Sequence, residues 1–288
     1  MVSRVDLHLH TTSSDGVHSP EDIMARAAAR GLEIISICDH DTVEGIGPAL
    51  AAAADYSGLT FIPGVEVSTD FQKGEVHVLG YFIDQDHPGL NQTLKTMRQS
   101  RVERARAMVK KLAGLGIHIE WARVRELAGS GSIGRPHIAQ AMLEKGHIAT
   151  IGDAFYSYLG HGQPAYVERI KMSPQEAIAL ILAAGGLPVL AHPMTIDEPE
   201  TMISNLAVAG LVGLEVYYGG SSPDQIEQLV KTAARHGLIT TGGSDYHGLD
   251  DNNETPIGGA PVPMEAALKL IDLAEERALK ATAVKERL

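Results

Sequence analysis

The sequence predicts an α/β fold, because short apolar runs of strand length alternate with helical patterns along most of the chain. Three of the predicted helices begin at a proline that follows a serine, namely Pro20, Pro174 and Pro223, and a proline suits the first helical position. Such alternation predicts a mostly parallel sheet or barrel, with functional residues at the C-terminal ends of its strands.

The predicted elements follow one another in a regular order. Strands are predicted at 5–10, 33–39, 60–68, 75–83, 187–192, 213–218 and 238–244. Helices are predicted at 20–30, 43–54, 174–184, 198–209 and 223–236, and a closing helix at 264–288.

One region interrupts this rhythm. Residues 91–166 carry only helical patterns, including a long basic helix at 98–115 and the segment Gly134-Arg135-Pro136-His137. We therefore predict a barrel domain at 1–90 and 167–288, and a small helical insertion domain at 91–166 that caps the active site.

Composition excludes several classes of protein. The net charge of −12 argues against binding of long nucleic acid, which needs a basic face. No run approaches the roughly 18 apolar residues of a membrane span, and the single cysteine, Cys38, excludes an internal disulfide framework. The sequence predicts a cytoplasmic protein without membrane contact, in which Cys38 is a buried strand residue.

The first strand carries the first indication of chemistry. In a strand, residues two apart point to the same side, so His8 and His10 project together, and Asp15 follows in a loop that can fold back over them. Two imidazoles and a carboxylate suit a divalent ion such as Zn, Mn or Fe. A His-x-His pair alone is weak evidence for a metal site.

Further histidines and acids recur at the predicted strand ends. Each has a structural alternative, as a capped turn or a core residue with its hydrogen bonds satisfied, but an unpaired carboxylate in an apolar strand is costly to bury. Their recurrence on successive strands predicts one shared metal cluster. The additional candidates are His40 within Asp39-His40-Asp41, then Glu66, His77, His192, Asp245 and His247.

These motifs, in their order along nearly the whole chain, resemble those of the polymerase-and-histidinol-phosphatase (PHP) family. The segment Gly134-Arg135-Pro136-His137-Ile138-Ala139 in a helical insertion resembles the stand-alone phosphoesterases of that family. The resemblance implies a distorted (β/α)7 barrel of PHP type. It also implies a centre of two to three divalent ions, with Mn as the first expectation and Fe or Zn as alternatives.

The resemblance also implies a role for each candidate. His8, His10, Glu66 and Asp245 would hold one ion. Glu66 would bridge to a second ion held with His77 and His192, and Asp15, His40 and His247 would hold the third. Asp39 and Asp41 would orient imidazoles rather than bind metal directly.

Such a cluster predicts hydrolysis of phosphate esters, because cations generate a nucleophile at neutral pH and offset phosphoryl charge. Glu66, Asp245, His192 and His247 are the predicted catalytic residues. His192, His247 and a water held by the metals are alternatives for protonating the leaving group. Arg135 at a helix start is predicted to bind a second phosphate, together with His137; the alternative is a surface arginine beside a structural histidine.

Three functions remain open, and the substrates of the first two are those that the resemblance to the PHP family implies. The first is hydrolysis of the 3′-phosphate of 3′,5′-nucleoside bisphosphates, so that the partner is a small phosphorylated nucleotide. The second is 5′→3′ exoribonuclease activity on short 5′-phosphorylated RNA, with other reactions of the family, on cyclic ribose phosphates or histidinol phosphate, ranked lower. The third, a non-catalytic module stabilised by metal, is disfavoured by the complete set of candidate ligands.

Overall fold

The structure is a computed structural model that describes residues 3–71, 74–129, 133–168, 172–196, 199–249 and 254–285. The chain divides into two compact units, Met1–Asn91 with Met172–Leu288, and Gln92–Lys171. The first unit is an α/β barrel and the second is entirely helical in its described part. Each unit is described by itself.

The barrel is one seven-stranded sheet in which the strands follow the order of the sequence. Its first and last strands are joined by a bridge between Leu9 and Tyr246, where the His10 N–H donates to the Tyr246 carbonyl at 3.0 Å. The sheet is therefore nearly closed, which confirms the predicted α/β barrel. The strands are β1 (Val5–Leu9), β2 (Ile34–Ile37), β3 (Thr60–Phe71), β4 (Gly74–Tyr81), β5 (Leu187–Leu190), β6 (Gly213–Tyr218) and β7 (Ile239–Gly243).

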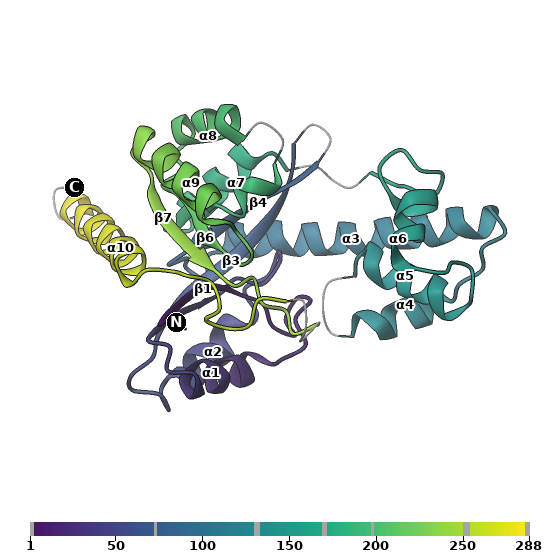
Figure 1. The fold of residues 1–288 in the computed structure, drawn as a ribbon, viewed down its shortest axis with the longest axis horizontal. Coiled ribbons are helices and arrows are strands. Elements are labelled where there is room, and N and C mark those ends of the chain that lie inside the picture. The colour runs from purple at the N-terminus through teal and green to yellow at the C-terminus, as the bar shows by residue number, and fades with distance from the viewer. Residues whose placement is uncertain are drawn as a thin grey trace. The chain divides into compact units, whose positions relative to one another are not determined.

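Helices cover the outside of the strands (Figure 1). The predicted serine–proline starts are observed: Ser19, Ser173 and Ser222 each accept a hydrogen bond from a backbone N–H of the first turn. The helices of this unit are α1 (Pro20–Ala29), α2 (Ile46–Ala53), α7 (Pro174–Ala183), α8 (Pro199–Val208), α9 (Pro223–Arg235) and α10 (Met264–Lys285), with a 3₁₀ turn, η2, at Pro193–Thr195.

The third and fourth strands differ from the prediction. β4 is antiparallel to both β3 and β5, so the sheet is parallel only on either side of it. Glu66 and His77 consequently lie inside β3 and β4 and not at strand ends. β3 has 12 residues and β2 only 4, so Glu66 reaches the level of His40, just beyond β2, and forms a bridge with it.

The second unit has its own hydrophobic core, formed by buried side chains such as Leu112, Ile138 and Met142. The long basic helix begins at Pro88, earlier than predicted, and the imidazole of His87 accepts the Leu90 N–H at 3.1 Å at its start. The boundary between the units falls within this helix. The elements are α3 (Pro88–Gly114), α4 (Trp121–Ala128), α5 (Arg135–Glu144), α6 (Ile151–Ala154) and η1 (Phe155–Leu159). That this unit caps the active site stays a prediction.

The barrel core joins buried side chains from β1, β3, β4 and β5, among them Leu7, Ile62, Leu79 and Val189. Cys38 is fully buried beside the same strands. In the described part of the chain, no helix is both long and apolar enough to cross a membrane. Because the interior is apolar, the part of the barrel able to perform chemistry is the group of polar side chains at one rim.

Candidate metal centre

Four predicted ligands converge where the ends of β1 and β7 meet the middle of β3. His8 Nε2 lies 3.3 Å from both Glu66 Oε2 and Asp245 Oδ1, and 3.1 Å from His10 Nε2. His10 Nε2 lies 3.0 Å from Asp245 Oδ1 and 3.3 Å from Glu66 Oε2. Ligands at the usual ~2.1 Å from one ion stand roughly 3.0–3.4 Å apart in octahedral or tetrahedral geometry, so the four atoms are spaced as the ligands of one cation.

The local fold explains this convergence. His8 and His10 share a side of β1 through the two-residue period of a strand. Gly243 lets β7 close on β1, because a Cβ at Gly243 would stand 2.5 Å from the backbone nitrogen and Cβ of His8. The following turn places Asp245 with φ +57°, a left-handed conformation that is uncommon outside glycine and concentrates at functional sites.

A second group surrounds Asp15. Its Oδ1 lies 3.4 Å from His247 Nε2 and 3.6 Å from His10 Nδ1, and its Oδ2 lies 3.8 Å from His40 Nε2. His247 Nδ1–H donates to the Asp245 carbonyl at 2.8 Å, and this hydrogen bond turns Nε2 toward Asp15. The loop after β1 thus folds back over the histidines, as the sequence predicted.

Glu66 stands between two sets of imidazoles. Its Oε2 faces His8 and His10 and lies 3.0 Å from His40 Nδ1. Its Oε1 lies 2.9 Å from His77 Nδ1 and 3.2 Å from His192 Nε2. A carboxylate with histidines on both oxygens has the arrangement of a bridging ligand.

The donor atoms fall into three groups whose members lie within 4.8 Å of one another. His40 differs from the prediction in joining two of them, because its ring spans from Asp15 to Glu66. His10 likewise joins two groups. The groups are His8, His10, Glu66 and Asp245; His10, Asp15, His40 and His247; and His40, Glu66 and His77.

Several donor atoms of this cluster are buried and lie near other polar atoms, yet form no hydrogen bond of acceptable geometry among the described residues. They are His10 Nδ1, Asp15 Oδ1, His40 Nδ1, Glu66 Oε2 and His77 Nδ1. Such orphaned atoms are rare because each costs desolvation energy. Divalent cations would satisfy them, and mixed imidazole and carboxylate donors suit Zn, Mn or Fe. The residues present therefore fit a metal centre.

The electrostatics also favour positive charge here. Burial alone lowers the pKa of His8, yet the carboxylates of Glu215, Asp245 and Glu66 hold it well above its usual range. For His10, burial is likewise outweighed by Asp245 and Glu66, and its pKa rises to about 10. The carboxylates thus create a site of negative potential, in which cations can replace the protons on the imidazoles.

Glu215 is a functional residue that the sequence analysis missed. It is fully buried in β6; its Oε1 accepts the Nδ1–H of His8 at 2.8 Å and its Oε2 accepts the His192 N–H at 2.7 Å. This pair of hydrogen bonds turns His8 Nε2 toward the cluster. The signal was present: an acid in the apolar run Leu214-Glu215-Val216 is the same pattern that identified Glu66.

The prediction that Asp39 orients an imidazole is wrong, because its hydrogen-bond partners lie in the loop after β1. Asp39 accepts hydrogen bonds from the Thr11 N–H and Oγ1–H and from the Ser14 Oγ–H, at 2.7–2.8 Å, and so fixes the loop that carries Asp15. Asp41 accepts the Ser68 N–H at 2.8 Å. Both carboxylates hold backbone in place near the ligands.

Arg135 and His137 lie in the second unit. Arg135 is the first residue of α5, and its guanidinium lies 5.6 Å from the centre of the Phe155 ring. The Gly134 N–H donates to His137 Nδ1 at 3.0 Å, so His137 caps the start of α5. A structural function is therefore established for His137, while substrate binding by either residue stays a prediction.

A nearly closed α/β barrel that carries clustered imidazoles and carboxylates at its rim is the framework of a metal-dependent hydrolase. The PHP domain family matches residues 6–182. The chain belongs to the PHP family and is a metal-dependent phosphoesterase.

Three relatives support this assignment. The chain is 36% identical over 256 residues to a 3′,5′-nucleoside bisphosphate phosphatase from Chromobacterium violaceum, covering 85% of this chain and 88% of the relative. It is 35% identical to a 5′-3′ exoribonuclease from Haemophilus influenzae, covering 86% and 91%. A crystal structure from Bifidobacterium adolescentis, assigned as a metal-dependent phosphoesterase, superposes with a TM-score of 0.80 at 31% identity, covering 93% and 95%.

Proposed function

We propose that this enzyme hydrolyses the 3′-phosphate of 3′,5′-nucleoside bisphosphates. The observation that carries the proposal is Glu66, whose two carboxylate oxygens face separate sets of histidines. A centre of several cations that share one bridging carboxylate suits phosphate esters, whose charged oxygens need more than one positive partner. The similarity to the bisphosphate phosphatase of Chromobacterium violaceum supports this choice of substrate.

We assign His8, His10, Glu66 and Asp245 to one ion. His77 and His192 would hold a second ion with Glu66, while Asp15, His40 and His247 would hold a third, with Mn as the expected metal. His40 also faces Glu66, so it is the ligand placed to respond to a change at either of these two ions. Bound cations would lower the pKa of a coordinated water and offset the charge of the phosphoryl oxygens.

The remaining chemistry is proton transfer to the leaving oxygen, for which His192 and His247 are the candidates. The Thr195 hydroxyl donates to the His192 carbonyl at 2.9 Å and lies 3.3 Å from His192 Nδ1, so Nδ1 carries the ring proton and Nε2 faces Glu66. His247 is oriented in the same way by the Asp245 carbonyl. Each turns Nε2 toward a carboxylate of the cluster, so this nitrogen would either bind a cation or, where no cation holds it, carry the proton for the leaving oxygen.

Selectivity for a substrate with two phosphates requires a second anion site. We assign it to Arg135, because a guanidinium binds phosphate in a bidentate manner and α5 begins at this residue. His137 supports the site by capping the same turn.

A second candidate function is 5′→3′ exoribonuclease activity on short 5′-phosphorylated RNA. It is favoured by the 35% identity to the enzyme of Haemophilus influenzae. The two activities are chemically compatible, since each substrate offers a terminal 5′-phosphate for the anion site and a neighbouring ester for the metals.

A phosphate-release screen separates these functions. The purified protein, supplied with Mn, is assayed on nucleoside monophosphates, 3′,5′-nucleoside bisphosphates, short 5′-phosphorylated RNA and the same RNA without the 5′-phosphate. We expect the highest kcat/KM for the bisphosphates. A higher kcat/KM for 5′-phosphorylated RNA would establish the exoribonuclease, and equal rates on mono- and bisphosphates would refute selection for two phosphates.

A further inference from the structure

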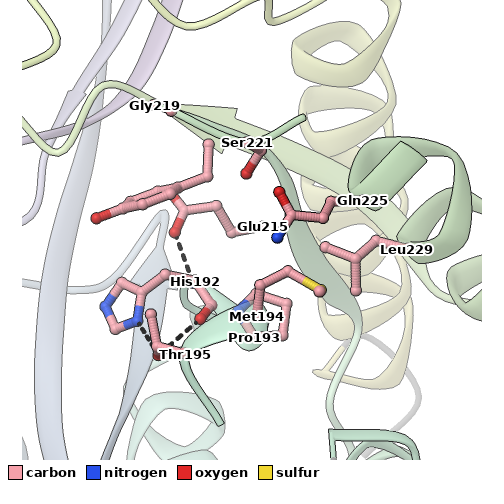
Figure 2. A pocket seen from close by; sticks show the side chains of 11 residues that line it. His192, Pro193, Met194, Thr195, Glu215, Gly219, Ser221, Gln225 and Leu229 are labelled. Atoms are coloured by element: carbon pink, nitrogen blue, oxygen red, sulfur yellow. Dashed lines mark hydrogen bonds between the residues drawn. The ribbon is translucent and has the colours of Figure 1, made fainter. Parts of the chain in front are cut away.

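A cavity of about 210 Å³ adjoins the metal centre between η2 and the start of α9 (Figure 2). Its border with the centre is formed by His192 and Tyr218. The Tyr218 hydroxyl donates to Asp245 Oδ2 at 2.9 Å, and its ring lies 5.6 Å from that of His192. The rest of the lining includes Met194, Thr195, Ser221, Gln225 and Leu229.

The lining excludes a second phosphate as the occupant. None of the residues that line the cavity, all of which lie in the described part of the chain, is a lysine or an arginine. The buried carboxylate of Glu215 also contributes to the lining and would repel an anion. The cavity therefore suits an uncharged group.

Apolar side chains in the lining make the cavity suitable for a planar ring of a ligand. Leu229 is buried, and Pro193 and Met194 also line the cavity (Figure 2). The polarisable thioether of methionine packs well against aromatic rings. A volume of about 210 Å³ is below the ~300–1,000 Å³ of sites for whole ligands, so only one ring system of a larger molecule fits.

Gln225 provides a hydrogen-bond donor for the edge of such a ring. Its Oε1 accepts the Ser222 N–H at 2.8 Å as part of the capping box of α9. This hydrogen bond fixes the orientation of the amide, and its nitrogen is the end directed toward Met194, another lining residue, in the view of Figure 2. An amide NH₂ donates two hydrogen bonds and pairs with the ring nitrogens or carbonyls of a base.

We propose that this cavity binds the nucleobase of the substrate whose phosphate reaches the metal centre. The proposal rests on the proposed function, because it assumes a nucleotide substrate. It adds that base and phosphate are held on the same side of the barrel, with Gln225 and Met194 as the residues that contact the base. Activity on nucleotides would then exceed activity on the same phosphorylated sugar without a base.

The sharpest variant is Gln225→Glu. Glutamate at this third helical position preserves the capping box, since its carboxylate still accepts the Ser222 N–H, but it removes the NH₂ donor. Gln228→Glu makes the same charge change at an exposed position of the same helix and is the matched control. Thermal melting should show both variants folded.

The assay compares adenosine 3′,5′-bisphosphate with the corresponding base-free sugar 3,5-bisphosphate. We expect wild type to prefer the nucleotide by at least about tenfold in kcat/KM, the scale of one or two lost hydrogen bonds. Gln225→Glu should remove most of that preference while retaining activity on the base-free substrate, and Gln228→Glu should behave as wild type. Equal kcat/KM of wild type on both substrates, or an equal loss on both in Gln225→Glu, would overturn the proposal.

Failure of the proposed function has a different outcome, namely hydrolysis of neither bisphosphate. In that case base binding in the cavity is tested with adenosine alone, by saturation-transfer NMR. Contact of adenosine base protons with wild type and Gln228→Glu, lost in Gln225→Glu, would support base binding. Absence of contact with wild type would refute it.

Discussion

Glu215 accepts a hydrogen bond from the side of His8 that faces away from the metal cluster. Its Oε1 lies 2.8 Å from His8 Nδ1, and both side chains are fully buried. The other carboxylate oxygen accepts the His192 N–H at 2.7 Å. One residue of β6 thus orients an imidazole from β1 and the turn after β5, two of the places where the cluster is assembled.

Glu215→Gln should therefore weaken metal binding. The amide of glutamine has one acceptor oxygen for two N–H donors, so either His8 or the His192 backbone loses its partner. Loss of such orienting contacts typically costs about 10–100-fold in metal affinity or activity. Competition with a fluorescent chelator would measure the affinity; a value within twofold of wild type would show that the contact with His8 is not needed.

Glu66→Ala and Asp245→Ala should nearly abolish turnover. Each removes a carboxylate that lies within 3.3 Å of both His8 and His10, and Glu66 also separates two sets of histidines. Residual kcat above about a tenth of wild type, which corresponds to only ~1.4 kcal/mol of barrier, would contradict the assignment. Circular dichroism checks that the variants are folded, and Glu44→Ala, an exposed acid after β2, is the control.

The protein purified without chelators should carry two to three divalent ions per chain. The buried donor atoms without hydrogen-bond partners, such as His77 Nδ1 and His40 Nδ1, provide the physical reason. Elemental analysis measures the content, and removal with chelator followed by addition of Mn should abolish and restore activity. Less than about one equivalent, with no gain of activity on adding Mn, would refute the cluster.

Arg135→Ala should reduce kcat/KM for a 3′,5′-nucleoside bisphosphate. The expected loss of transition-state stabilisation is roughly 2–4 kcal/mol, the range of a lost charge-assisted pair. Hydrolysis of an aryl monophosphate should hardly change, because that substrate has no second phosphate. Arg125→Ala, an exposed arginine of α4, serves as the control. Equal losses on both substrates would place Arg135 in the chemistry or in folding.

Cys38 should be inert in the native protein. Burial raises the pKa of its thiol from 9.0 to about 12, so at pH 8 the native thiol carries about a thousandfold less thiolate than an exposed one. Alkylation by iodoacetamide, followed by mass spectrometry, should be slow without denaturant and fast in guanidinium. Rapid labelling of the native protein would show that β2 opens.

The sequence by itself determined the class of fold and most of the histidines and acids that converge at the rim of the barrel. Apolar runs of strand length and serine–proline helix starts are local signals, and they located the strands and most helices to within a few residues. The candidate ligands were recognisable because a charged or imidazole side chain in an apolar strand needs a partner. His8, Glu66 and Asp245 meet in the structure as that reasoning required.

The tertiary structure alone decided how these residues are grouped. The reversal of β4 depends on pairing with β3 and β5, and neither partner is visible in the local pattern of β4. The position of His40 between Asp15 and Glu66 and the support of His8 by Glu215 join segments far apart in the chain. A periodic pattern reports which side of its own strand a residue occupies, whereas contacts between strands depend on the register and closure of the whole barrel.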